Sequence, residues 1–327
     1  MGLRRIHLSL FTALAILSLP LQSAQAETWP SRPIRFIVPL PPGGAYDYIA
    51  RLLANRLSLA LGVPIVVENK PGASAQVGTE YVSRARADGY TFLVNANTHV
   101  ILPSLFLKLP YDAIKDFEAV SLVVEIPFVL VVNPNVPVHS AKEFITLAEN
   151  KQGSLEYGSS GIGSPFHLDA ELLKLRTGTN ILHVPYRGTG PLIQALLAGE
   201  VSSAFVPIGP YLQYINTGKL RPLALAGSSR SSLLPGVPTI EEAVPLPGYS
   251  MNSWIGVVAP AGTPKQIIER MNAEIVRVVK DEQIIKEQLL PQGYESVGST
   301  SEHFMEVMKR DLAMYAKIVK DANIPPQ

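Results

Sequence analysis

Short runs of β-branched and apolar residues alternate with helical patterns along most of this chain. The strand candidates are residues 34–40, 64–69, 90–95, 128–133, 155–159, 181–186, 202–207, 221–226 and 254–260. Between the first two runs, residues 47–61 carry apolar side chains three and four positions apart, which is the spacing of an amphipathic helix. This alternation predicts an α/β protein whose mainly parallel sheets are covered by helices on both faces.

The alternation stops after Pro264, where two long helical patterns follow with at most a short strand, residues 294–298, between them. Helices without strands of their own have to cover a sheet that is already built. We therefore expect a first lobe made of residues 27–127 and 252–327 and a second lobe made of residues 128–251. Two crossings of the chain between these lobes would form a hinge.

The first residues have the pattern of a secretory signal peptide. Arg4 and Arg5 precede an apolar stretch, residues 8–20, and the small residues Ala24 and Ala26 suit a signal peptidase. The apolar stretch is too short to span a bilayer comfortably. We predict cleavage after Ala26 and a periplasmic location.

Composition excludes several kinds of protein. The chain has no cysteine, which excludes a disulfide framework, thiolate metal sites, a cysteine nucleophile and a lipid-bearing cysteine. Its 28 basic and 27 acidic residues leave a formal net charge of +1, so no basic footprint for nucleic acid is present. Neither a Walker loop nor the glycine spacing of a dinucleotide fold occurs, and we expect no cofactor.

Three strand-to-helix loops are rich in glycine, serine and proline. The first contains Pro42, Gly43 and Gly44, the second contains Ser159, Ser160, Gly161, Gly163 and Ser164, and the third contains Gly188 and Gly190. Each loop leads into a helix N-terminus, where free backbone amides and a partial positive charge favour an anion. Ligands of open parallel sheets bind beyond the carboxyl ends of the strands, which is where these loops fall. The loops predict a site for a small carboxylate, although tight turning alone is the alternative explanation.

Five more residues next to these loops are candidates for ligand contact. They are Tyr46, Asp47, Asn97, Thr98 and Arg187. Asp47 could meet a ligand or bond the amides of its own loop, and Arg187 could pair with a second carboxylate or face solvent. Asn97 and Thr98 follow the third strand and could donate to a ligand oxygen or cap the next turn.

Little in the sequence supports catalysis. His99 and His167 lie near the loops, but no metal-ligand spacing is present, and we expect both to be structural. The second loop offers serines without the G-x-S-x-G spacing of a serine hydrolase. We therefore expect a binding protein and not an enzyme.

Several motifs together resemble one known family. The segments are WPSRPIRFIVPLPPGGAYDYIARLLANRL, DGYTFLV, VPYRGTGPLIQALLAGEV, TGKLRPLAL, LPGVPTIEE and GVVAPAGTP. They are similar to Bug-type solute-binding proteins of tripartite tricarboxylate transporters, in order and across the predicted mature chain. The resemblance implies a type II periplasmic-binding-protein fold, with a ligand carboxylate held between the Pro-Gly-Gly loop and the Gly/Ser loop. It also implies delivery to a membrane permease, and we expect a monomer.

The chain departs from that family at one informative position. Where many relatives have Phe-Asp-Asn after a strand of the second lobe, this sequence reads Phe205, Val206 and Pro207. Loss of the acid removes a partner for a ligand ammonium group. We therefore predict an apolar or aromatic mono- or dicarboxylate ligand in preference to an amino acid, with Val206 beside it. A periplasmic partner that reports the carboxylate to a signalling system is the alternative function.

Overall fold

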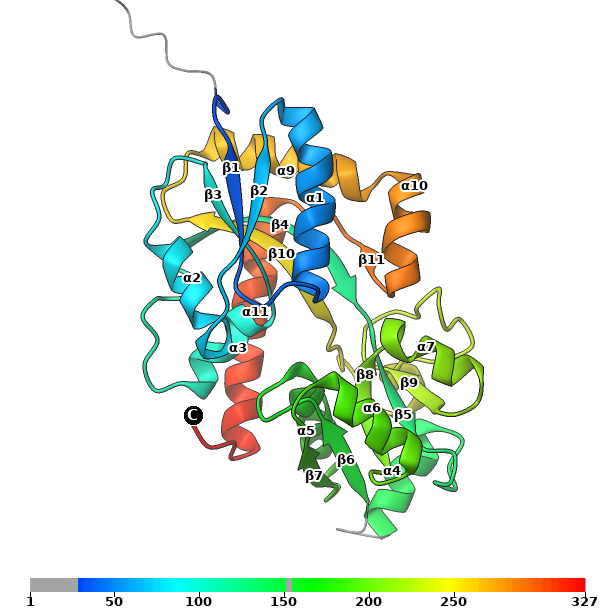
Figure 1. Ribbon diagram of the computed structural model, residues 1–327. Helices are drawn as coiled ribbons and strands as arrows, with labels where there is room; N and C mark the ends of the chain where they lie inside the picture. The colour runs from blue at the N-terminus through cyan, green and yellow to red at the C-terminus, as the bar shows by residue number, and fades with distance from the viewer. Residues whose placement is uncertain (1–28, 151–154, 327) are drawn as a thin grey trace, which may run out of the picture.

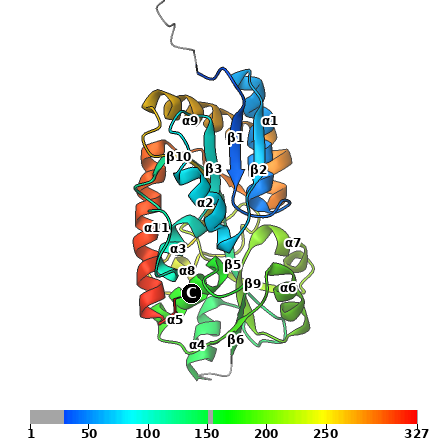
Figure 2. The same ribbon diagram turned by 60° about the vertical axis from the view of Figure 1, so that its left-hand side comes forward.

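The computed structural model describes residues 29–150 and 155–326, and the predicted signal peptide lies outside these residues. The described chain forms two α/β lobes, one above the other in Figure 1. The first lobe is built on a six-stranded sheet with the order β11-β4-β10-β3-β1-β2, and the second on a five-stranded sheet with the order β7-β6-β8-β5-β9. A side view shows the same division (Figure 2).

The first lobe is built from two parts of the described chain, one before and one after the second lobe. Its strands are β1 (Ile34–Val38), β2 (Ile65–Asn69), β3 (Thr91–Ala96), β4 (Phe117–Ile126), β10 (Ser253–Pro260) and β11 (Glu295–Ser296). Its helices and helical turns are α1 (Ala45–Leu61), η1 (Ala73–Ala75), α2 (Gln76–Ser83), α3 (Thr98–Leu105), α9 (Lys265–Val279), α10 (Glu282–Ile284), η2 (Ile285–Leu289), η3 (Leu290–Gln292) and α11 (Ser301–Asp321).

The second lobe comes from the middle of the chain. Its strands are β5 (Phe128–Val132), β6 (Glu156–Ser159), β7 (Leu182–Pro185), β8 (Ser203–Pro207) and β9 (Arg221–Leu225). Its helices are α4 (Ala141–Asn150), α5 (Pro165–Thr177), α6 (Thr189–Ala198), α7 (Ile208–Asn216) and α8 (Ile240–Ala243). The lobe boundaries that we placed after residues 127 and 251 stay a prediction about how the chain divides in solution.

Both sheets are mixed, which corrects the expectation of mainly parallel sheets. In the first lobe β1 pairs in parallel with β2 and β3, whereas β10 is antiparallel to both β3 and β4. In the second lobe β6 is parallel to β7 and β8, whereas β5 is antiparallel to β8 and β9. The reason lies in the crossings. β10 brings the chain back from the second lobe to the first, and β5 carries the chain into the second lobe. Each of these strands therefore runs opposite to its neighbours in the sheet.

The crossing out of the first lobe depends on a long strand that the sequence analysis did not predict. β4 has ten residues, and only Pro127 separates it from β5 in the other sheet. A proline cannot donate to a strand ladder, so it marks a point where one sheet can end and another can begin. The two strands therefore form one extended path that joins the lobes.

The crossing back is fixed by the side chain of Asn97, which is fully buried at the N-cap of α3. Its Oδ1 accepts hydrogen bonds from the Ser253 hydroxyl and the Trp254 amide, both at 2.7 Å. Its Nδ2 donates to the Asn252 carbonyl at 3.2 Å and to the Tyr315 hydroxyl at 2.8 Å. One amide thus ties the end of β3 to the start of β10 and to α11.

The two lobes also touch away from the crossings. Gly209, in the first turn of α7, lies against Gln292 and Gly293, where an added methyl group would overlap the Gln292 carbonyl. Gly163 of the second lobe lies equally close to the side chain of Leu105 in α3. The long helix α11 runs from the first lobe down beside α5 in Figures 1 and 2. The lobes are therefore in direct contact on both sides of the crossings.

We expect Asn97→Ala to lower the free energy of unfolding by about 3 kcal/mol, because it leaves buried donors and acceptors of three segments without partners. Asn55→Ala, which removes an exposed amide from α1, is the matched control and should change stability by no more than about 0.5 kcal/mol. Urea unfolding followed by circular dichroism measures both values. Equal stabilities of the two variants would show that Asn97 does not hold the return crossing.

Candidate ligand-binding site

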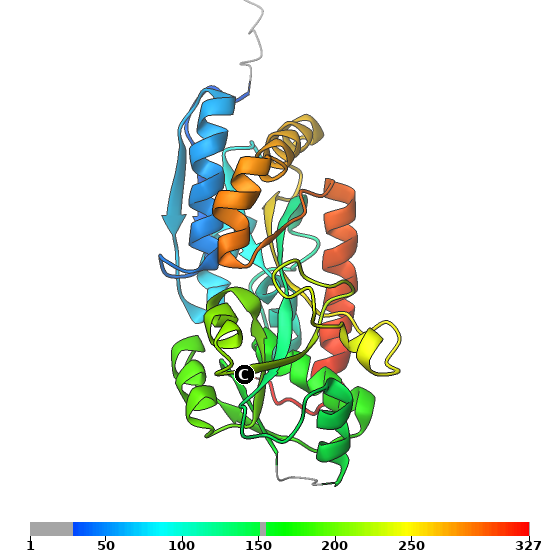
Figure 3. The ribbon, with the colours of Figure 1, turned by 90° about the vertical axis from the view of Figure 1, so that its right-hand side faces the viewer.

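The loop between β1 and α1 lies at the end of the first lobe that faces the second lobe (Figure 3). Pro42, Gly43 and Gly44 are all exposed there. Gly43 has a φ of +89°, a left-handed conformation that favours glycine. Gly44 is the N-cap of α1 and supplies no side-chain hydrogen bond to the first turn. The start of this helix is therefore exposed, and its binding of an anion stays a prediction.

Asp47 organises this loop from within. Its carboxylate accepts a hydrogen bond from the Gly43 amide at 3.0 Å and from the Asn69 side chain at 3.0 Å. Arg51 donates to both carboxylate oxygens at 2.9 Å. These contacts, those of Arg51 above all, lower the pKa of Asp47 to about 2. Of the two roles left open for Asp47, the structure has the one in which it bonds an amide of its own loop.

Tyr46 and Thr98 meet at the carboxyl ends of β1 and β3. The Tyr46 hydroxyl lies 3.2 Å from the Thr98 hydroxyl, which in turn lies 3.3 Å from Oδ1 of Asn95. Burial raises the pKa of Tyr46 to about 12, so its hydroxyl stays protonated and can donate. The neighbouring Tyr48 donates to the Gln288 carbonyl and packs on the other side of the helix. Of these two tyrosines, Tyr46 is therefore the one that connects the start of α1 to α3.

The Gly/Ser loop after β6 is held by its own polar side chains. Ser164 caps α5, with Pro165 as the first helical residue, which is a favourable start for a helix. The Ser164 hydroxyl also donates to the Gly161 carbonyl at 2.7 Å. Ser159 is fully buried, so its side chain supports the loop from beneath. Ser160 and Gly161 are partly exposed and Ile162 is exposed, so these three residues form the accessible part of the loop.

Two stacked histidines hold this loop in place. The His167 and His183 rings lie 4.0 Å apart with an interplanar angle of 11°. His167 Nδ1 accepts from the Gly163 amide at 3.0 Å, and His183 Nε2 lies 2.7 Å from the Ser159 hydroxyl. Burial lowers the pKa of both histidines to about 4, so both are neutral at pH 7. The prediction that His167 is structural agrees with these contacts.

The sequence analysis did not consider His183. Its role depends on strand pairing that local sequence patterns do not give: β6 and β7 pair in parallel with Tyr157 opposite His183. The two rings stack with centroids 4.8 Å apart. Tyr157 also donates to the Glu171 carboxylate, which Lys174 contacts at 2.7 Å. The loop therefore rests on a packed polar cluster.

The third loop lies directly beside the second. The Gly188 amide donates to the Ser160 carbonyl at 3.2 Å, and Gly188 is the N-cap of α6 without a side-chain hydrogen bond. Arg187 is exposed and has no ion pair with any residue in the described part of the chain. Val206 has no exposed surface and lies in the apolar core, next to Pro207, which is partly exposed. Its predicted contact with a ligand stays a prediction.

The described residues contain no group of three or more histidine, aspartate or glutamate side chains placed to hold a metal ion. Among the helices of residues 29–150 and 155–326, none has the length and apolar character to cross a membrane. What the loops offer is hydrogen-bond donors. Backbone amides at the starts of α1 and α6, together with Ser160 and Arg187, can bind a carboxylate.

The chain is similar to proteins of one known family. Residues 49–324 match the family model described as tripartite tricarboxylate transporter family receptor. Protein BugT of Bordetella pertussis is 34% identical over 316 residues, which cover 96% of this chain and 95% of BugT.

Solved structures show the same fold. An R. palustris protein solved with adipate is 33% identical, with a TM-score of 0.77 over 91% of this chain and 100% of that one. MatC from Rhodopseudomonas palustris, solved with bound malate, is 30% identical, with a TM-score of 0.73 over 89% of this chain and 99% of that one. The predicted periplasmic-binding-protein fold with two α/β lobes is confirmed. This chain belongs to the tripartite tricarboxylate transporter family of periplasmic solute-binding receptors.

Proposed function

We propose that the protein captures a small organic carboxylate between its two lobes and delivers it to a tripartite tricarboxylate-type membrane transporter. The observation that carries the proposal is the pair of helices, α1 and α6, that begin at glycines without side-chain caps. An anion can accept hydrogen bonds from the free amides of such first turns. Relatives solved with adipate and with malate support a carboxylate as the ligand class.

We further propose an apolar or aromatic mono- or dicarboxylate in preference to an amino acid. β8 ends in Val206 and Pro207, so this strand end carries no carboxylate for a ligand ammonium group. Arg187, exposed beside the third loop, is the cation available to a second carboxylate. Tyr46 adds a ring and a hydroxyl donor at the first loop.

A ligand screen tests the proposal. The protein is unfolded in denaturant and refolded, which removes ligand acquired during expression, and then heated with aliphatic, hydroxy, aromatic and amino carboxylates. A ligand at a hundred times its dissociation constant adds about 2.7 kcal/mol of stability and raises the melting temperature by several degrees. Stabilisation by aspartate or glutamate alone would contradict the ligand class, and product formation during incubation would contradict a receptor.

We expect His167→Leu to weaken carboxylate binding by about tenfold or more, since it leaves the buried Gly163 amide without an acceptor. His167→Asn is the matched control, because its side-chain oxygen can take the place of Nδ1 and keep the loop in position. Isothermal titration calorimetry at pH 7 measures both. Equal loss in the two variants would show that the acceptor at this position does not position the loop.

The same histidines predict a pH dependence of stability. Their folded-state pKa of about 4 lies below the 6.5 of the unfolded chain. The unfolded state therefore takes up protons first as the pH falls. The titration of these two histidines should leave the free energy of unfolding unchanged above pH 6.5 and lower it between pH 6.5 and pH 4. His167→Asn should show a shallower decline in urea titrations at several pH values, and an unchanged slope would contradict burial as the cause.

Asp47→Ala should weaken binding of the identified carboxylate by about tenfold, because the Gly43 amide and Asn69 lose their acceptor and the first loop loses its shape. Glu269→Ala is the control: it removes another helix carboxylate with an i,i+4 basic partner, but an exposed one. Calorimetric titration of both variants gives the comparison. Unchanged affinity in Asp47→Ala would exclude the first loop from the site.

A further inference from the structure

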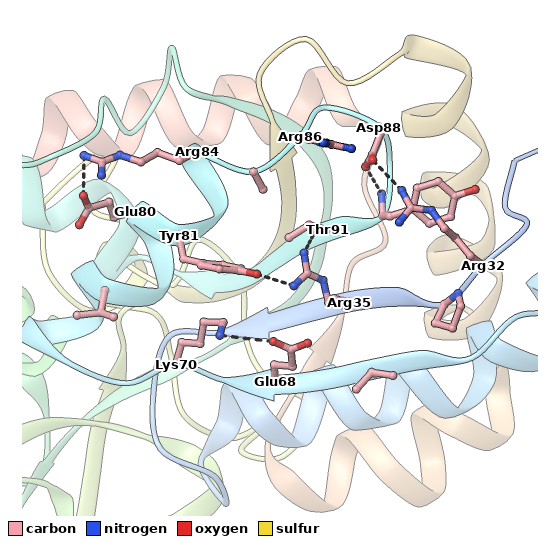
Figure 4. Close-up of a pocket in the computed structure, with 15 residues that line it drawn as sticks. Arg32, Arg35, Glu68, Lys70, Glu80, Tyr81, Arg84, Arg86, Asp88 and Thr91 are labelled. Atoms are coloured by element: carbon pink, nitrogen blue, oxygen red, sulfur yellow. Dashed lines mark hydrogen bonds and ion pairs between the residues drawn. The ribbon is translucent and has the colours of Figure 1, made fainter.

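A cavity of about 1100 Å³ lies on the first lobe, lined by β1, β2, β3 and α2 (Figure 4). None of the residues that line it belongs to the three loops of the carboxylate site. The cavity is therefore a separate feature of the sheet face, and the function proposed above does not use it.

The cavity exists because α2 covers only part of this face. Arg35 and Ile37 of β1 point to the same side of the sheet, two residues apart. Ile37 is fully buried in an apolar cluster with Val82 of α2. Arg35 is only partly buried, and Val66 on the edge strand β2 is 46% exposed. The ends of β1 and β2 that lie farther from the second lobe therefore form the open floor of the cavity.

The cavity has more cations than it can pair. Its five cationic side chains are Arg32, Arg35, Lys70, Arg84 and Arg86, and its three carboxylates are Glu68, Glu80 and Asp88. The carboxylates form ion pairs with Lys70 at 3.5 Å, Arg84 at 2.7 Å and Arg32 at 2.8 Å. Arg35 and Arg86 make no ion pair with any residue in the ranges that the structure describes. Two positive charges therefore remain.

Arg35 is the residue that points to a ligand. Its guanidinium lies at the centre of the cavity and donates to the Tyr81 hydroxyl and, at 2.9 Å, to the Thr91 hydroxyl (Figure 4). Both acceptors are neutral, and a guanidinium has five N–H donors, so the cation is oriented but not neutralised. A partly buried cation without a counter-charge is costly, and a bound carboxylate or phosphate would offset that cost.

The surroundings of Arg35 favour an anion in a defined orientation. Lys70 lies 4.4 Å from the centre of the Tyr81 ring, and the Arg35 guanidinium lies 5.6 Å from the same ring. Both cations therefore lie close to the Tyr81 side chain. Arg86 lies at the rim of the cavity, between Arg84 and Asp88 in Figure 4. A ligand with one anionic group on Arg35 would place a second group within the field of Arg86.

We propose that this cavity is a second binding site, for a small polyanion that carries two or more carboxylate or phosphate groups. Arg35 binds one anionic group at the floor, with Tyr81 and Thr91 as the residues that orient it. Arg86 attracts the second group at the rim. The site binds its ligand without closure of the two lobes, because all of its lining residues belong to the first lobe.

Citrate and inorganic phosphate are the probes, titrated by calorimetry at low ionic strength into the refolded full-length mature protein. We expect citrate to bind more tightly than phosphate. Arg35→Gln should weaken citrate binding by about tenfold or more, and Arg86→Gln by a smaller factor. Arg56→Gln, which removes an exposed arginine of α1 outside the cavity, is the charge-matched control and should leave affinity unchanged. Thermal unfolding checks that each variant is folded.

The two sites are distinguished with Asp47→Ala, because Asp47 bonds the first loop and does not line the cavity. Citrate binding that survives in Asp47→Ala and is lost in Arg35→Gln supports the second site. Binding that is lost in Asp47→Ala and kept in Arg35→Gln would place citrate between the lobes and overturn the proposal. Equal affinity of Arg35→Gln and Arg56→Gln, or no binding of either probe at millimolar concentration, would overturn it as well.

Discussion

The chain leaves the first sheet and has to return to it, and the side chain of Asn97 holds the point of return. Its amide joins the end of β3 to β10 and α11, whose bonded residues lie more than 150 residues after Asn97 in the sequence. Because β10 inserts between β3 and β4, the six-stranded sheet is complete only when this return is in register. The first lobe therefore depends on a strand that follows the second lobe in the sequence, and the loops at the carboxyl edge of the first sheet depend on this strand.

Two buried or partly buried carboxylate and imidazole groups fix the shape of the loops by accepting hydrogen bonds from their amides. Asp47 takes the Gly43 amide, and His167 takes the Gly163 amide. The glycines that begin α1 and α6 receive no such partner. Donors that the loop holds in fixed positions can bind an anion without reorganisation of the loop. This arrangement suits a receptor, which binds its ligand through positioned hydrogen-bond donors and does not react with it.

Local signals were sufficient to predict the parts of the structure that local contacts decide. The strand, the Pro-Gly-Gly turn and the helix around Gly43 follow from residue types a few positions apart, as does the Ser164 cap. β4 was missed, because its apolar run continues into β5 and only Pro127 divides them. The roles of Asn97 and His183 could not be found in this way, since their partners come from distant segments or from across a strand pair. Contacts between distant segments, and not local preferences for helix or strand, decide the roles of these residues.

Gly209 and Gln292 meet main chain against main chain, with no side chain between the lobes at that point. Side chains can change rotamer under load, whereas two packed backbones cannot yield without breaking their own helical turns. This steric contact therefore limits how near the two lobes can come at this point. A carboxylate bound between the lobes, as proposed, would therefore meet lobes that are already in main-chain contact at this point.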